Sequence, residues 1–187
     1  MLGSDTGRVI HTAGLNDYFH HALRSAAGRR HLRVDQATLH YVALLLCDYA
    51  RSEQVFDYAE QRLQLRPLAL LYAEALEAPS QRERRLWLQR LGDLALFVGG
   101  LFAGRLSRRF QDLDYCVAMG GNAYDYLQQT AKHADEQAQA TVFGELAEQF
   151  AHCVDLIATV TGKCPPSAPG GANAATEDLA CMSHRFS

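Results

Sequence analysis

Five polar residues in the middle of the sequence are the strongest candidates for a binding site. Asp93 lies between Leu91 and Leu94 in the most apolar part of the chain, and an unpaired carboxylate is costly to bury. We therefore expect a hydrogen-bonding partner from a neighbouring helix, with Tyr124 and Asn122 as the first candidates. The complete set of ligand-pocket candidates consists of Asp93, Asp114, Tyr115, Asn122 and Tyr124.

The sequence leaves two interpretations of this polar set open. In the first, the residues form a satisfied hydrogen-bond network that fixes how two helices cross. In the second, they line a small polar pocket between helices, which is a common position for ligands in helical proteins. We favour the first interpretation.

The sequence contains no recognisable catalytic signature. It has neither the Gly-x-Ser-x-Gly turn of an activated serine nor a Walker-type phosphate loop. Cys153 follows a histidine, but adjacent residues on a helix point in different directions. Cys47, Cys116 and Cys153 lie in helical patterns and are expected to be small buried hydrophobes. We therefore predict no catalytic residue and favour a non-enzymatic role.

The eight histidines do not form a metal-binding motif. His-Glu-x-x-His is absent, and no Glu-x-x-His repeat indicates a di-iron bundle. Glu145, Glu148 and His152 share a helix face by spacing, but that face lies opposite the apolar stripe, so we predict no metal site. A haem would need an axial ligand such as His40 or Cys47, and no motif supports either residue. The sequence names no cofactor.

Charge is distributed unevenly along the chain, although the net charge is only −3. Residues 82–109 contain seven arginines and two acids, a balance of +5, whereas residues 110–161 contain eight acids and one lysine, a balance of −7. The two segments either attract each other within the fold or pair two subunits. Nucleic acid is not an expected partner, because no clear recognition helix lies between the two arginine groups of the sequence, at 29–33 and 105–109. The candidate basic surface is formed by Arg105, Arg108 and Arg109.

Two helices are expected to position the polar set. Ser80 and Glu83 form a Ser-x-x-Glu capping box at the start of the first helix. Its apolar pattern continues to the Gly-Gly pair at 99–100, which either ends the helix or lets another backbone approach. The second helix contains a second Gly-Gly pair, Gly120 and Gly121. Each glycine destabilises a helix by about 1 kcal/mol relative to alanine. There we favour a close helix crossing over a ligand lying against bare backbone.

The remaining patterns predict an all-α fold. We expect a single-domain bundle of five to six helices over residues 15–161. Residues 1–14 are expected to be a flexible lead, and residues 162–187, which are rich in Pro, Gly, Ala and Ser, a disordered tail. Outside the central pair, Asn16 is expected to cap a helix that runs to Ala27, and Asp35 one that runs to about residue 50. Further helices are expected over 52–65, then a short one with Pro67 in its first turn, and a last one from Asp135 to Gly162.

The runs LGDLALFVGGLFAGRL and DLDYCVAMGGNAYDYL are the most distinctive part of the sequence. They resemble an uncharacterised family of bacterial, mostly proteobacterial, all-helical proteins. The resemblance extends over roughly residues 40–127 and implies a bacterial soluble protein, without implying a reaction. Cys116 departs from the pattern, which usually has a second tyrosine there. The matching positions are Gly92, Asp93, Leu96, Phe97, Gly100, Phe102, Asp114, Tyr115, Met119, Gly120, Ala123 and Tyr124.

Composition limits the possible roles of the 187-residue chain. It is 48% hydrophobic, which excludes global disorder. The start lacks a basic-then-apolar signal sequence and no apolar run reaches about 18 residues, so we expect a cytoplasmic protein without membrane contact. The leading hypothesis is a non-enzymatic protein that binds another protein or forms a homodimer. The alternative is a protein that binds a small ligand, haem or metal, and could be an enzyme, with its pocket around Asp93 and Tyr124.

Overall fold

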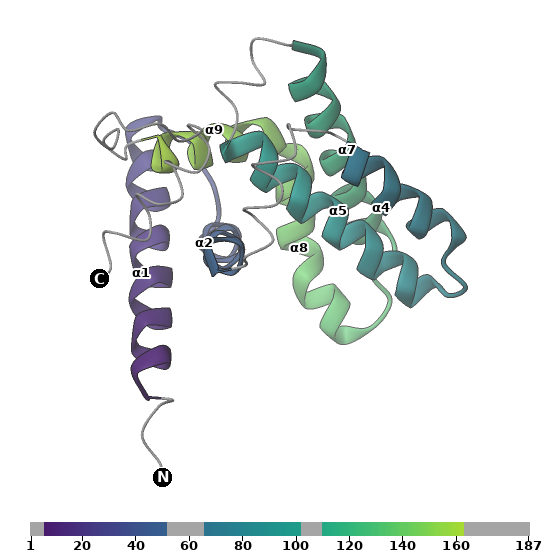
Figure 1. Ribbon diagram of the computed structural model, residues 1–187, viewed down its shortest axis with the longest axis horizontal. Coiled ribbons are helices and arrows are strands. Elements are labelled where there is room, and N and C mark those ends of the chain that lie inside the picture. Colours follow the sequence, from purple (N-terminus) through teal and green to yellow (C-terminus); the bar gives the residue numbers. More distant parts are fainter. Residues whose placement is uncertain (1–5, 52–65, 102–109, 163–187) are drawn as a thin grey trace, which may run out of the picture. The chain divides into compact units, whose positions relative to one another are not determined.

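A computed structural model describes residues 6–51, 66–101 and 110–162 of the chain. These residues form seven α-helices and no strand (Figure 1), so the predicted all-α class is confirmed, with more helices than the predicted five to six. Three predictions lie outside the described residues. They concern the helix over 52–65, the basic residues Arg105, Arg108 and Arg109, and the tail after Gly162. The helices are α1 (Thr6–Arg29), α2 (Gln36–Arg51), α4 (Arg66–Glu77), α5 (Gln81–Leu101), α7 (Phe110–Gln129), α8 (Ala134–Glu148) and α9 (Phe150–Thr161).

Contacts group the chain into two compact units, whereas the sequence predicts one bundle domain. Within the described residues, the first unit comprises α1, α2 and the end of α9 from Thr159. The second unit comprises α4, α5, α7, α8 and α9 up to Ala158. Among the described helices, none combines the length and the apolar character that crossing a membrane requires.

The described part of the first unit is formed mainly by α1 and α2, which pack against each other (Figure 1). Phe19 and Leu23 are buried on α1, and their spacing of four residues places them one turn apart on the same side of the helix. The prediction that Asn16 caps this helix is wrong, because α1 begins at Thr6 and Asn16 lies inside it. A residue that favours helix starts cannot impose one where the preceding residues also form a helix. Asp35 does cap α2, since its Oδ1 accepts the Ala37 N–H at 3.3 Å.

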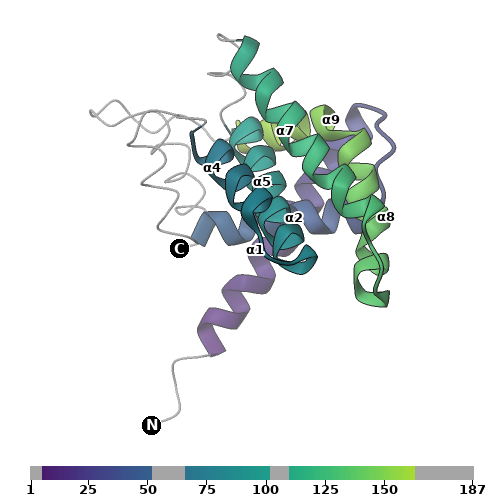
Figure 2. The ribbon, with the colours of Figure 1, turned by 90° about the vertical axis from the view of Figure 1, so that its right-hand side faces the viewer.

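The second unit is organised around α5. In this unit α4 packs on α5, α5 on α7, and α7 on α8 (Figure 2). The C-terminal half of α5 is buried almost all round, including Leu94, Ala95, Leu96 and Phe97. A helix without a polar face must be enclosed by other helices, and the second half of α5 meets this requirement within the second unit.

Three glycines allow these helices to approach closely. A Cβ atom added at Gly100 would lie 2.5 Å from the Cβ of Ile157 on α9, and one at Gly120 would lie 2.2 Å from Cζ of Phe150. At Gly99 the nearest atom would be Cγ2 of Val154, at 3.2 Å. The close helix crossing predicted at 120–121 is therefore present, and at 99–100 the structure favours close approach, one of the two alternatives. The nearest side chains at Gly99, Gly100 and Gly120 come from α9, and Gly120 also lies close to Ala95 on α5.

The last predicted helix is divided in two, which corrects the prediction of one helix from Asp135 to Gly162. The chain leaves helical geometry at Gln149, where φ is −109° and ψ is 22°. The Gln149 N–H still donates to the Glu145 carbonyl, and the Gln149 carbonyl accepts the Cys153 N–H. Because the backbone polar groups stay paired across the break, its cost is small. This division gives α8 and α9, and it accounts for the additional helix.

Candidate functional site

The structure brings together two of the five predicted polar residues. The Tyr124 hydroxyl on α7 donates a hydrogen bond of 2.7 Å to Oδ1 of Asp93 on α5. Tyr124 is fully buried and Asp93 partly buried, so the first-named candidate partner is confirmed. Asn122 and Asp114 are exposed, and Tyr115 is partly exposed. Successive residues turn by about 100° on a helix, which explains why α7 cannot direct all four of its candidates towards Asp93.

The Tyr124 ring fills the space around this hydrogen bond. It stacks on Phe143 at 5.7 Å between ring centroids with 13° between the planes, and it lies 6.0 Å from the Phe150 ring. A Cβ atom added at Gly92 would come within 2.8 Å of Tyr124 Cε1. Dense packing on these sides favours the interpretation in which Asp93 and Tyr124 fix the helix crossing. The predicted ligand pocket around them stays a prediction.

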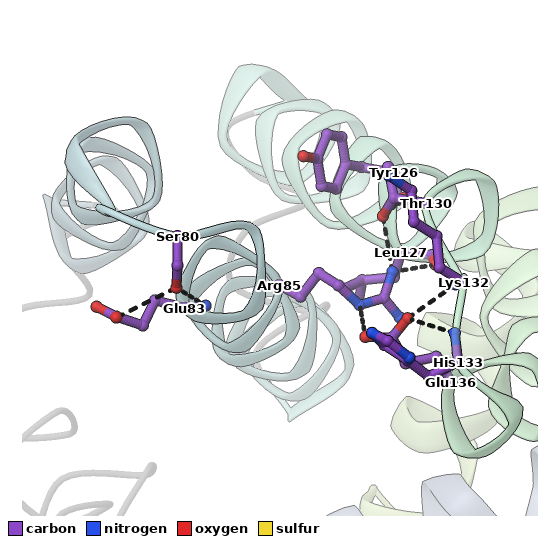
Figure 3. Close-up of polar contacts among 9 residues, drawn as sticks. All are labelled: Ser80, Glu83, Arg85, Tyr126, Leu127, Thr130, Lys132, His133 and Glu136. Carbon is purple, nitrogen blue, oxygen red and sulfur yellow. Dashed lines mark hydrogen bonds and ion pairs between the residues drawn. The ribbon is translucent and has the colours of Figure 1, made fainter.

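A second polar cluster, which the sequence analysis did not identify, is centred on Arg85 (Figure 3). This arginine is only 8% exposed. Its Nη1 donates to the Leu127 carbonyl and to Oγ1 of Thr130, each at 2.7 Å. Its Nε lies 3.2 Å from Oε1 of Glu136. One guanidinium therefore connects α5, the end of α7 and the start of α8.

Glu136 completes this cluster through its second carboxylate oxygen. Oε2 accepts the backbone N–H groups of Lys132 at 2.8 Å and His133 at 3.2 Å. These two N–H groups, and to a smaller degree the charge of Arg85, hold the pKa of Glu136 below its ordinary value, while desolvation acts in the opposite direction. The carboxylate is thus ionised at neutral pH and satisfied at both oxygens.

The one feature of the sequence that pointed to this cluster was the opposite charge of the segments 82–109 and 110–161. Arg85 belongs to the basic segment 82–109 and Glu136 to the acidic segment 110–161, so this pair meets within the fold. The sequence could not single out Arg85 among seven arginines. The neighbouring capping signal was more specific, since the Glu83 N–H donates to Ser80 Oγ at 3.2 Å and the Ser80 hydroxyl donates to the Glu83 carboxylate at 3.2 Å.

A pocket of about 340 Å³ lies beside the Arg85 cluster. It is formed where the first turns of α5 and α8 meet the connection between α7 and α8. The described residues include no group of three His, Cys, Asp or Glu side chains that could hold a metal ion, here or elsewhere. The pocket is lined by Gln81, Arg82, Thr130, Lys132, His133, Asp135 and Glu136.

Comparison with protein-family models, with curated proteins and with solved structures gives no match. The resemblance to the bacterial helical family therefore stays a prediction. The function must be argued from the sites themselves.

Among the described residues, the cysteines are buried and form no disulfide: Cys47, Cys116 and Cys153. Their predicted character as small buried hydrophobes is confirmed. Burial raises the pKa of the Cys153 thiol from 9.0 to about 12, and the negative charge of Glu145 adds to the effect. The thiolate is the reactive form, so burial keeps the Cys153 thiol in its protonated, less reactive form at neutral pH.

We expect Cys153 to resist thiol reagents at pH 9 in the folded protein. An ordinary thiol is about half ionised at that pH, whereas a thiol with a pKa near 12 is ionised to about 0.1%. A Cys164→Ser/Cys181→Ser variant leaves three cysteines, and their reaction with a chromogenic disulfide reagent should be more than about 100-fold slower before than after denaturation. Rapid native labelling at Cys153, located by peptide mass spectrometry, would contradict this expectation.

Proposed function

We propose that the protein is a non-enzymatic helical protein that acts by binding a second copy of itself through the outward sides of α4 and α5. The observation that carries this proposal is the exposure of large apolar side chains on α4. Leu70 is 57% exposed, Tyr72 44% and Leu76 59%. Side chains of this size are normally buried, and a group of them on one helix favours a protein interface.

Small residues join these side chains into one surface. Ala69 and Ala73 are also exposed, and by helical spacing they fall between Leu70 and Leu76 on the outward side of α4. The opposite side of the helix buries Leu68 and Ala75. The outward side thus carries large apolar side chains separated by small residues. Helices that bind partner proteins commonly present such a face.

The charges around this surface favour a second copy as the partner. Glu74 and Glu77 are exposed on α4, whereas Arg82 and Arg90 are exposed on α5. A two-fold axis parallel to these neighbouring helices places α4 of one copy over α5 of the other, so acidic residues face basic ones on both sides. Leu86, which is 53% exposed, lies one turn from each arginine and adds an apolar contact.

Trp87 on α5 also fits a binding surface. The Arg90 guanidinium lies 5.0 Å from the centroid of the Trp87 ring. Tryptophan, tyrosine and arginine are the residue types most enriched among the energetically important positions of protein interfaces. Their presence on the α4–α5 hairpin supports an interaction role, and the cytoplasm stays the predicted location for it.

Self-association is tested by sedimentation equilibrium of the full chain and of a Leu70→Gln/Leu76→Gln variant. We expect a dimer whose dissociation constant rises at least about tenfold in the variant, since two buried leucines contribute more than about 1.4 kcal/mol together. Added salt should weaken the dimer because its charged contacts are exposed.

Leu44→Gln is the matched control, because Leu44 is a leucine 43% exposed on α2, outside the proposed surface. This variant should dimerise as the natural chain does. A natural chain that remains monomeric at about 50 μM and low salt, where weak homodimers of μM affinity would form, would contradict the proposal.

A further inference from the structure

The pocket beside the Arg85 cluster has the composition of a site for a small charged ligand. All its lining side chains are polar or charged, and its volume of about 340 Å³ is at the lower end of the range for ligand sites. An apolar ligand would bury little apolar surface against these side chains. Four of the lining residues, Thr130, Lys132, His133 and Glu136, lie close together beside Arg85, on the connection between α7 and α8 and the first turn of α8 (Figure 3).

The charge that this pocket presents is positive once internal pairing is considered. The negative charge of Glu136 is already compensated by its ion pair with Arg85 and by hydrogen bonds from two backbone N–H groups. Within the described part of the chain, no hydrogen bond or ion pair engages the side chains of Arg82, Lys132 or Asp135. Two cations and one carboxylate therefore remain available to a ligand, which gives an excess of positive charge.

We propose that this pocket binds a small oxyanion, namely phosphate or the phosphate group of a small ester. A guanidinium such as that of Arg82 matches the geometry of phosphate oxygens with two parallel N–H groups. The ammonium of Lys132 supplies a second positive charge, and the Gln81 amide supplies neutral donors. The side chains carry this assignment, and the nearby starts of α5 and α8 also favour negative charge.

The Arg85 cluster prepares this site without contacting the ligand. If Glu136 were not paired with Arg85, its carboxylate would repel an anion from the same wall. The bonds from Arg85 to Leu127 and Thr130 also fix the end of α7, from which the connection carrying Lys132 begins. Arg85 is thus a positioning residue, and the proposed ligand contacts come from Arg82 and Lys132. Arg82 also belongs to the proposed dimer surface, whereas Lys132 lies outside it, so Lys132→Gln tests the phosphate site separately from self-association.

Isothermal calorimetry with inorganic phosphate and, separately, glycerol phosphate tests the assignment on the full chain. Chloride at equal ionic strength controls for general salt effects. We expect saturable binding of one ligand per chain, weakened about tenfold by either Arg82→Gln or Lys132→Gln, because each removes one charge-assisted contact. Asp135→Asn should tighten binding, since it removes the remaining carboxylate from the wall. Tighter binding of the ester would identify a phosphate ester as the ligand, and equal binding a free oxyanion.

Arg24→Gln is the matched control, because Arg24 is an exposed arginine on α1 that neither lines the pocket nor belongs to the proposed α4–α5 surface. Its phosphate affinity should equal that of the natural chain. Circular dichroism should show that all of these surface variants keep their helices. A response to phosphate no larger than that to chloride, or an affinity unchanged by both Arg82→Gln and Lys132→Gln, would overturn the proposal.

Discussion

Alanine at Gly100 is expected to lower the free energy of unfolding by about 2 kcal/mol, as overpacking of a closely packed helix crossing usually does. The new Cβ would lie 2.5 Å from the Cβ of Ile157 and 2.4 Å from its Cγ2. A Cβ atom is fixed to the backbone, so no rotamer change relieves the overlap and α5 and α9 must move apart. This cost exceeds the gain of about 1 kcal/mol that alanine brings to a helix.

Gly121→Ala provides the matched control in a helix of the same unit. A Cβ there would meet its nearest atom, the Ala147 carbonyl oxygen, at 3.7 Å, which is an ordinary contact. Only the helix-propensity gain remains at this position, so the variant should be as stable as the natural chain or more stable by up to about 1 kcal/mol.

Urea denaturation of both variants, followed by circular dichroism, measures the difference. The two substitutions change the same atoms, so their difference reports the space at each crossing. A Gly100→Ala protein that matches Gly121→Ala in stability would mean that α9 does not press against α5 at Gly100.

The local signals in the sequence were sufficient for much of the helical fold. Ser80 and Asp35 were correctly predicted to cap helices because a cap needs only a side-chain oxygen beside the first free N–H groups. The burial of the second half of α5 followed from an apolar pattern without a polar face. Pro67 also fell where expected, in the first turn of α4.

Two further features were missed because no local residue marks them. The break at Gln149 contains neither proline nor glycine, and its backbone polar groups remain paired, so it leaves no signature in the sequence. The Arg85 cluster depends on the Leu127 carbonyl and on the connection before α8, which approach Arg85 only after folding. The partner of Asp93 could be predicted, because burying its charge requires a hydrogen bond. The neighbouring helix has few polar side chains that could make this bond, and Tyr124 is one of them.

Replacing Asp93 with alanine is expected to lower the free energy of unfolding by about 2 kcal/mol, within the usual range for leaving a buried polar partner unsatisfied. The fully buried Tyr124 hydroxyl would lose its acceptor at 2.7 Å. Its ring is held between Gly92 on α5 and Phe143 on α8, so the hydroxyl cannot readily turn to water. Asp114→Ala is the control, since Asp114 is an exposed aspartate of the same predicted set, and it should change stability by less than about 0.5 kcal/mol.

A double-mutant cycle separates this hydrogen bond from other effects of the carboxylate. Tyr124→Phe keeps the packed ring and removes only the hydroxyl, so it should destabilise the natural chain by about 1 kcal/mol and the Asp93→Ala chain much less. Chemical denaturation of the four proteins gives the coupling energy, expected to be about 1 kcal/mol. Additive losses would show that the two residues act independently. An Asp93→Asn protein that kept full stability but lost a copurifying small molecule would instead favour the ligand-pocket interpretation, because an amide can still accept the tyrosine hydrogen bond but carries no charge for a ligand.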